Sequence, residues 1–269
     1  IFTPQIRENV YTTRGSYFSR WKWARISHGF PKKSIYCKRI ESFILSVNQE
    51  FNPEIMTINT AKIRMLEGKP AIGAELALGS PLAAELLSNV GLDFILVDTQ
   101  HGAWADDSTM YAFRSISLGS STPMARVRQN NFGEIGRLLD AGALGVVVPM
   151  VNTKQEAEEA AFATRYPPKG GRSGGAFGTS YYGEGYDEKI NDEVFLAVQI
   201  ESKLGLQNAN EIMSVEGIDG CWIGPNDLAK SMGLDLQSSE GLKKHTDAIH
   251  EIVEICKQNH KIPGISTGS

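Results

Sequence analysis

From residue 60 onward, the sequence alternates short apolar runs with segments that repeat apolar residues at helical spacing. Such an alternation predicts a parallel sheet whose consecutive strands are joined by right-handed helical crossovers. Seven of the apolar runs are β-branched or bounded by glycine, as buried strands are. The predicted strands are Ala71–Leu78, Phe94–Asp98, Pro123–Val127, Gly145–Pro149, Phe195–Glu201, Cys221–Gly224 and Pro263–Thr267.

The number of repeated units selects among parallel α/β folds. Repeated βα units without a glycine-rich dinucleotide loop after the first strand favour a TIM (β/α)8 barrel over a doubly wound sheet. No eighth unit follows the last strand, and residues 56–269 make 214 residues, below the roughly 250 typical of this fold. We therefore predict a (β/α)8-type domain over 56–269 that lacks its last βα unit and is C-terminally incomplete. The predicted helices are Thr60–Glu67, Pro81–Val90, Ser108–Ser117, Phe132–Ala141, Thr153–Arg165, Lys203–Ser214 and Ser239–Asn259.

Residues 1–55 form a basic N-terminal extension that we predict to lie outside the core. Residues 1–40 hold nine Lys or Arg against one acid, a charge of +8, which leaves −12 for the rest of a chain of net charge −4. Three interpretations remain open: a transit peptide, a surface arm, or non-native sequence ahead of a true start at Met56. The acidic remainder argues against nucleic-acid binding by the main domain.

The composition is that of a globular protein without a membrane span. No apolar stretch approaches the roughly 18–20 residues that cross a bilayer. The three cysteines, Cys37, Cys221 and Cys256, are odd in number and lack CxxC spacing, which predicts reduced thiols in an intracellular protein. We expect a cytoplasmic protein with no membrane partner, or a mitochondrial one if the basic segment is a targeting signal.

Two acids stand where predicted strands end, and they point to a metal site. Glu201 ends the fifth strand and Asp227 follows the sixth. Ligands gather at the carboxyl ends of parallel strands, and converging carboxylates are satisfied by a divalent cation. Gln199 shares a strand face with Glu201 and suggests a polar barrel mouth. The simpler alternatives are that Glu201 caps the next helix or pairs with Lys203, and that Asp227 is an ordinary helix N-cap.

The second and third strands supply a further acid, a histidine and two arginines. His101 follows Asp98 by three residues in a loop at a strand end, which suits proton transfer near neutral pH. Arg126 and Arg128 share one face of the third strand. An arginine that points into a barrel is costly unless it binds an anion such as a carboxylate. We expect this role for Arg126 and a rim or surface position for Arg128.

Two features on the helix side are less specific. Asp140 closes a predicted helix, where an acid has the wrong sign for the helix dipole and suggests another partner. The segment Tyr166–Gly175, which continues to Tyr186, is long and rich in glycine. Its length suggests an active-site flap or a subunit contact, and it lacks the GKS/T ending of a phosphate loop.

From about residue 71 to its end, the chain resembles the HpcH/HpaI aldolase family, the metal-dependent class II pyruvate aldolases. The resemblance is carried by six motifs in order, and the set is specific although each motif alone is weak. The motifs are FILVDTQHG, MARVR, LLDAGALGVVVPMV, RYPPKGGRSGG, VQIES and IDGCWIGPNDLAKSMG.

The resemblance implies roles for individual residues. Glu201 and Asp227 would ligate Mg²⁺, Mn²⁺ or Co²⁺, and Arg126 would bind the pyruvyl oxygens and stabilise an enolate. His101 and Asp140 would form a dyad for proton transfer, with Asp98 in support. The substrate-binding candidates are Arg126, Gln199, Gly224, Pro225 and Asn226.

Two departures from the family pattern stand out. Gln100 stands where many relatives carry Glu, which removes a negative charge beside His101. The eighth unit is missing, and since the C-terminal helix commonly exchanges between subunits in this family, closure and assembly are both affected. We still expect a homo-oligomer.

The sequence therefore predicts a carbon–carbon lyase that cleaves a 4-hydroxy-2-oxo acid to pyruvate and an aldehyde. A bound cation and an arginine can stabilise the enolate that such cleavage leaves. One alternative is chemistry like that of macrophomate synthase, with decarboxylation of oxaloacetate and carbon–carbon bond formation. A lyase acting on CoA thioesters is disfavoured because no basic pocket for CoA phosphates is evident. The last alternative is a non-catalytic truncated barrel.

Overall fold

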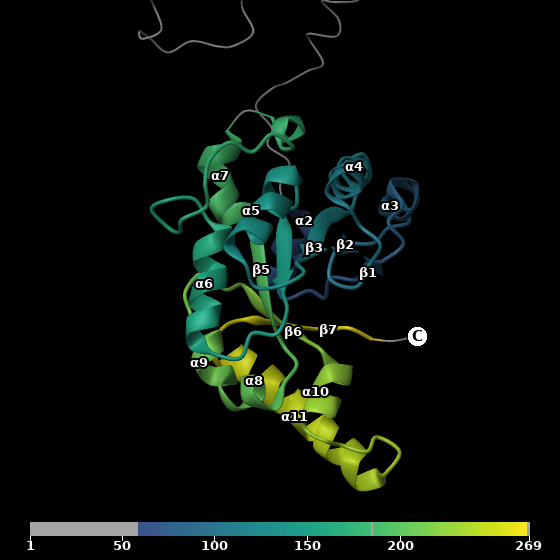
Figure 1. Ribbon diagram of the computed structural model, residues 1–269, viewed down its shortest axis with the longest axis vertical. Helices are drawn as coiled ribbons and strands as arrows, with labels where there is room; N and C mark the ends of the chain where they lie inside the picture. The colour runs from purple at the N-terminus through teal and green to yellow at the C-terminus, as the bar shows by residue number, and fades with distance from the viewer. Residues whose placement is uncertain (1–58, 184, 268–269) are drawn as a thin grey trace, which may run out of the picture. The chain divides into compact units, whose positions relative to one another are not determined.

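A computed structural model describes residues 59–183 and 185–267. The proposed basic extension over 1–55 lies outside the described residues. The described chain forms one all-parallel sheet of seven strands in the order β1 to β7, with helices along it (Figure 1). The strands are β1 (Gly73–Leu76), β2 (Phe94–Asp98), β3 (Thr122–Arg126), β4 (Gly145–Val148), β5 (Phe195–Ile200), β6 (Gly220–Ile223) and β7 (Ile262–Ile265).

The helices begin and end at residues suited to these positions. Ser80 accepts the Ala83 N–H ahead of Pro81, and Thr153 with Glu156 forms a capping box. Gly142 ends its helix with a φ of 117°, a left-handed conformation that glycine adopts readily. The helices are α2 (Thr60–Leu66), α3 (Pro81–Ser88), α4 (Asp106–Ile116), α5 (Phe132–Ala141), α6 (Lys154–Thr164), η1 (Ser180–Tyr182), α7 (Tyr186–Glu193), α8 (Lys203–Gln207), α9 (Ala209–Met213), α10 (Pro225–Ser231) and α11 (Ser239–Gln258).

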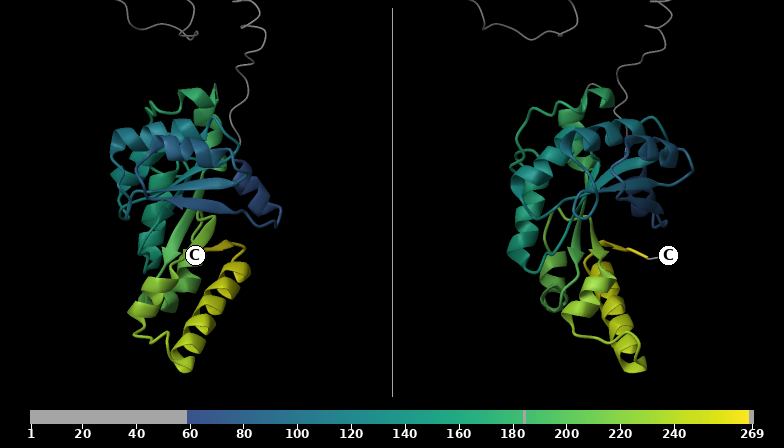
Figure 2. Two further views of the ribbon diagram at one scale, coloured as in Figure 1. Left: turned by 90° about the vertical axis from the view of Figure 1, so that its right-hand side faces the viewer. Right: turned by 45° about the vertical axis from the view of Figure 1, so that its right-hand side comes forward.

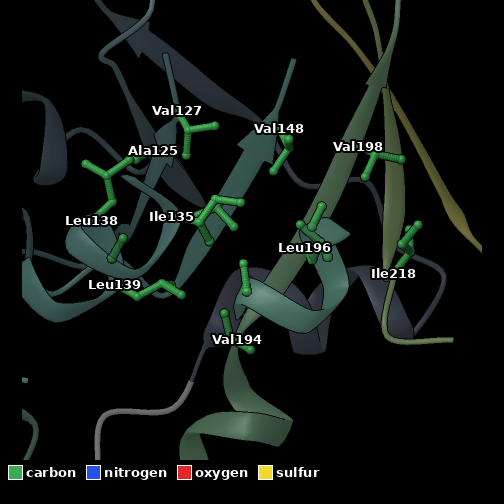
Figure 3. Close-up of a cluster of buried hydrophobic side chains, with 14 of the residues drawn as sticks. Ala125, Val127, Ile135, Leu138, Leu139, Val148, Val194, Leu196, Val198 and Ile218 are labelled. Carbon is green, nitrogen blue, oxygen red and sulfur yellow. The ribbon is translucent and has the colours of Figure 1, made fainter. Parts of the chain in front are cut away.

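Both faces of the central strands β2 to β5 are buried, so these strands are almost continuously apolar. On β5, Leu196, Val198 and Ile200 belong to the outer core beneath the helices. Phe195 and Ala197 alternate with them and belong to a separate inner cluster, as the period of two in a strand requires. Figure 3 shows side chains of the outer core where α5 packs on the sheet.

The inner face of the curled sheet holds apolar side chains and a groove. Leu96, Met124 and Val147 pack there with Ala61 of α2, which covers the amino end of the inner face. The two edge strands, β1 and β7, are at the two ends of the sheet (Figure 2). A groove of about 770 Å³ on this inner face is lined by both edge strands.

At the amino ends of the strands, a buried ion network joins distant parts of the chain. The carboxylate of Asp219 pairs with Lys62 Nζ at 3.0 Å and with Arg165 Nη2 at 3.0 Å. It also accepts a hydrogen bond from the Leu196 backbone N–H at 2.8 Å. Lys62 also donates to the carbonyl oxygens of Asp192 and Val194. The network therefore ties α2 and α6 to the ends of β5 and β6.

The prediction of an all-parallel sheet with helical crossovers is confirmed, and each of the seven strands begins and ends within two residues of its predicted bounds. Three helical elements were not predicted: η1 and α7 within and after the glycine-rich segment, and α10 after β6. Within residues 59–183 and 185–267, no helix has the length and apolar character needed to cross a membrane.

Candidate active site

The carboxyl ends of β1, β2 and β3 meet in a buried ion cluster around Arg126. Asp98 receives a two-pronged contact from this guanidinium, with Nε to Oδ1 at 2.8 Å and Nη2 to Oδ2 at 2.7 Å. Glu75 of β1 accepts from the same Nη2 at 2.8 Å. The side chains of Asp98 and Arg126 are 1% and 9% exposed, so the arginine is held in one orientation.

The electrostatics follow from this arrangement. Burial acts to raise the pKa of Asp98, but hydrogen bonds and the positive charge of Arg126 outweigh it and hold that pKa below its ordinary value. The pKa of Glu75 is raised, chiefly by burial and further by the charge of Asp98, although Arg126 acts in the opposite direction. The two carboxylates share the positive charge of Arg126, and this charge stabilises the ionised form of Asp98 more than that of Glu75.

Glu201 lies beyond the end of β5, buried at 4% exposure. Its Oε1 accepts the Met150 N–H at 2.9 Å, and its Oε2 accepts Gln199 Nε2 at 2.5 Å. Met150 has a φ of 56°, an unfavourable conformation for a residue with a side chain, of the kind that clusters at functional sites. Gly224 makes room for the carboxylate, because a Cβ there would lie 2.6 Å from Oε2.

The residues around Glu201 and Asp227 fit a divalent cation. Burial raises the pKa of Glu201, and the nearby negative charge of Asp227 raises it further. The hydrogen-bond donors to Glu201 are neutral, so a cation would relieve both effects. Within the described residues no group of three or more His, Cys, Asp or Glu side chains could hold a metal. A pair of carboxylates suits an ion such as Mg²⁺, which keeps several ligands from water or substrate.

Neither acid is a helix N-cap, and among the described residues Glu201 forms no ion pair with Lys203. Ser202, and not Glu201, caps α8 by accepting the Gly205 N–H at 2.9 Å. Gly224 is the N-cap of α10, so Asp227 lies in the first turn of that helix, with Pro225 and Asn226 before it. Asp227 is half-exposed and pairs with Lys230 at 3.1 Å, and an exposed ion pair of this kind costs little to exchange for a ligand.

His101 and Asp140 are not brought together within the described chain. His101 is exposed beyond β2, where its backbone N–H donates to Asp98 Oδ1 at 3.3 Å. A crossover helix runs antiparallel to the strands it joins, so α5 carries Asp140 to the amino-terminal edge of the sheet. There Asp140 accepts Arg172 at 2.8 Å, and this arginine is the other partner that the acid at a helix end suggested.

The glycine-rich segment packs onto the end of α5. Arg172 is buried against the rings of Tyr166 and Tyr186, at 4.5 and 5.9 Å from their centroids. The Gly178 N–H donates to the Asp140 carbonyl oxygen at 2.9 Å. Tyr182 donates its hydroxyl to the Gly142 carbonyl oxygen at 2.5 Å. These contacts attach the segment to the carboxyl end of α5, which lies at the amino-terminal edge of the sheet.

Glu75 is a site residue that the sequence reasoning missed. The strand Ala71–Leu78 was predicted, but the only acid in it was not singled out. A signal was present, because Gly73 and Glu75 share one face of the predicted strand, and an acid on the inner face of a parallel sheet needs a cation. Arg128, by contrast, is exposed as predicted and donates to the Trp104 carbonyl oxygen at 3.2 Å.

Comparison with known proteins gives a consistent result. Residues 76–265 match the family model described as HpcH/HpaI aldolase/citrate lyase. A hydroxypyruvate/pyruvate aldolase of Rhizorhabdus wittichii is 38% identical over 208 residues, which cover 76% of this chain and 81% of the relative. A 4-hydroxy-2-oxo-heptane-1,7-dioate aldolase of Escherichia coli is 36% identical over 214 residues, covering 77% and 80%.

A solved structure supports the same assignment. The crystal structure of an HpcH/HpaI aldolase/citrate lyase family protein from Burkholderia cenocepacia superposes with a TM-score of 0.70 at 29% identity. The superposition covers 78% of this chain and 85% of that protein.

Proposed function

This chain belongs to the HpcH/HpaI aldolase/citrate lyase family, and on that premise we propose that it cleaves a 4-hydroxy-2-oxo acid to pyruvate and an aldehyde. It is an aldolase like its named relatives. The observation that carries the proposal is the buried Arg126, which both carboxylate oxygens of Asp98 hold in place. The positive charge of Arg126 also acts on Glu201. A fixed cationic group beside a metal-binding carboxylate is what enolate formation requires.

Each residue then has a chemical task. Arg126 binds the oxygens of the 2-oxo acid, since Asp98 occupies its Nε and Nη2 and leaves Nη1 for the substrate. Glu201 and Asp227 would hold a divalent cation, and such an ion when bound would supply Lewis-acid polarisation of the 2-oxo group. Gln199, Gly224, Pro225 and Asn226 are the proposed neighbours of the bound 2-oxo acid.

We assign proton transfer to His101, which lies just beyond the carboxyl end of β2. The proposed partnership with Asp140 would require a second copy of the chain, because α5 places the two residues of one chain at opposite edges of the sheet. A homo-oligomer would supply that copy. Mixing inactive His101→Ala with inactive Asp140→Asn is expected to restore activity. Mixtures as inactive as their components would remove Asp140 from the catalytic set.

Three wider proposals accompany the function. We propose that the curled sheet is of the (β/α)8 type, supported by its sequential parallel order and by the superposition described above. The groove between β1 and β7 is the place that an eighth unit would occupy. We propose a cytoplasmic location, supported by the free thiols of Cys221 and Cys256, and a separate basic extension over 1–55.

The test is pyruvate release from oxaloacetate and from a 4-hydroxy-2-oxo acid, with Mn²⁺, Mg²⁺ or Co²⁺ added or with EDTA. Glu201→Ala serves as the blank, because free metal decarboxylates oxaloacetate unaided, and Glu251→Ala on the exposed face of α11 is the matched control. We expect metal-dependent activity that Glu201→Ala abolishes and Glu251→Ala retains. Equal rates with wild type and the blank would instead favour the non-catalytic alternative. Activity on oxaloacetate alone would favour the macrophomate synthase-like one.

A further inference from the structure

One oxygen of Glu201 is held by the loop that follows β4, and not by the strand that carries Glu201. The Met150 backbone N–H donates to Glu201 Oε1 at 2.9 Å, whereas Oε2 accepts Gln199, which lies on β5 itself. The carboxylate is 4% exposed, so its orientation depends on these two donors. The Met150 amide is therefore the contact through which the β4 loop acts on Glu201.

Met150 reaches Glu201 from a left-handed backbone conformation, and Asn152 holds it there. The φ of Met150 is 56°, and a residue with a side chain keeps such a φ only where surrounding contacts hold it. Asn152 Nδ2 donates to the Met150 carbonyl oxygen at 2.7 Å. The side chain of Asn152 thus bonds one end of the residue whose other end bonds Glu201.

The same side chain also contacts the residue that follows Glu201. Asn152 Oδ1 accepts a hydrogen bond from the Ser202 hydroxyl. The backbone of Asn152 is itself fixed, because its N–H donates to Glu156 Oε2 at 2.7 Å and its carbonyl oxygen accepts Asn208 Nδ2 at 2.8 Å. Asn152 therefore joins the β4 loop to the end of β5 at the point where Glu201 stands.

We propose that Asn152 is a positioning residue for the Glu201 carboxylate, and through it for the divalent cation of the site. The inference rests on the proposed aldolase function, because the cation at Glu201 is part of that proposal. Within the described residues, Asn152 forms no hydrogen bond to Glu201 itself, so it acts through Met150 and Ser202. Removing a hydrogen-bond partner behind a metal ligand typically weakens metal binding about 10- to 100-fold.

Two substitutions of Asn152 test this role. Asn152→Ala removes both side-chain hydrogen bonds, and Asn152→Leu removes them while nearly keeping the volume, so agreement between the variants separates hydrogen bonding from packing. Mn²⁺ binding is measured by electron paramagnetic resonance. We expect the Kd for Mn²⁺ to rise at least about tenfold in both variants.

The rate at saturating metal separates positioning from catalysis. Pyruvate release from oxaloacetate is followed as the Mn²⁺ concentration is raised, after subtraction of the Glu201→Ala blank. In both Asn152 variants more Mn²⁺ should be needed for half of the maximal rate. The kcat at saturating Mn²⁺ should stay within about threefold of wild type, because the lost interaction affects binding of the cation more than the chemical step.

Asn130→Ala is the matched control. Asn130 is also partly buried, and its Nδ2 also donates to a backbone carbonyl oxygen, that of Glu156 in α6, at 2.9 Å. Its substitution loosens the start of α6 without removing a bond to a neighbour of Glu201. Wild type and Asn130→Ala should have the same Kd for Mn²⁺, and urea denaturation in EDTA reports how far each variant is destabilised.

The contrary outcomes distinguish the role of Asn152 from the function it rests on. Equal Kd values in wild type and the Asn152 variants, or the same rise in Asn130→Ala, would overturn the positioning role alone. A kcat that stays low at saturating Mn²⁺ would overturn it as well. Wild type that neither binds Mn²⁺ nor releases pyruvate with it would overturn the aldolase function, and the role of Asn152 with it.

Discussion

The amino ends and the carboxyl ends of the strands, called here the amino-terminal and the carboxyl-terminal edge of the sheet, hold buried charges in opposite ways. At the amino-terminal edge, Asp219 accepts hydrogen bonds from Lys62, from Arg165 and from a backbone N–H. The ammonium group of Lys62 also donates to backbone carbonyl oxygens. At the carboxyl-terminal edge, two acids share Arg126, and Glu201 has only neutral donors. Gln199 Oε1 is buried there without a partner among the described residues. The Asp219 network is complete within the chain, whereas the Gln199 oxygen at the carboxyl ends is, among the described residues, an unpaired acceptor next to the proposed ligand site.

The largest effect is expected at the amino-terminal edge. Asp219→Ala would leave Lys62 and Arg165 buried without their carboxylate. Removing one partner of a buried ion pair typically costs about 3–5 kcal/mol of unfolding free energy. Urea denaturation measures this loss, and the folded fraction should keep the metal-dependent activity. A loss below about 1 kcal/mol, the size of an exposed ion pair, would contradict the comparison.

The opposite pattern is expected for Glu201→Gln. Loss of a metal ligand should lower kcat/KM at least about 100-fold, about 2.7 kcal/mol of transition-state stabilisation. Unfolding free energy without metal should stay the same or rise at neutral pH, because the raised pKa of Glu201 means that its charge is disfavoured in the folded state. Activity assays and urea denaturation in EDTA measure the two quantities. A large loss of stability would show that Glu201 is a structural residue.

A ligand should stabilise one edge and leave the other unaffected. At a concentration 100-fold above its Kd, a divalent cation adds about 2.7 kcal/mol to the unfolding free energy. Mn²⁺ titrations monitored by thermal unfolding should show this gain in wild type and not in Glu201→Gln. Asp219→Ala, with its carboxyl-terminal edge intact, should show the same gain from a lower starting Tm.

The smallest effect is a pH dependence at Glu75. A carboxyl whose pKa is higher in the folded than in the unfolded state binds its proton more tightly when folded. Stability is therefore lost as pH rises from its ordinary pKa of 4.5 through the raised value. The slope of unfolding free energy against pH in this window should be more negative in wild type than in Glu75→Gln. Identical slopes would mean that Glu75 has the same pKa in both states.

Much of the fold was predictable because it depends on local periodicity. The strands at Phe94, Phe195 and their neighbours are short apolar runs with clear boundaries, and a parallel order follows from their spacing. The helix α7 was missed because its sequence is polar, and its two buried side chains, Tyr186 and Ile190, give too little periodicity to detect.

The site was predictable where a residue stands at a strand end and less so elsewhere. Asp98, Arg126 and Glu201 were placed correctly at the carboxyl-terminal edge, although their roles stay proposals. The partner of Asp140 could not be read from the sequence, because Arg172 approaches from a segment without regular structure. Glu75 was overlooked because its charge lies inside a run that otherwise indicates a buried strand.

The attachment of the glycine-rich segment to α5 has a consequence for local opening. The Asp140 and Gly142 carbonyl oxygens, left without helical partners at the end of α5, are bonded by Gly178 and Tyr182. Separating the segment from the helix would break these bonds and expose the fully buried ring of Tyr182 at the same time, at a cost close to that of unfolding the region. The Gly178 amide should therefore exchange its hydrogen about as slowly as those of α5, and the segment and the helix open as one unit.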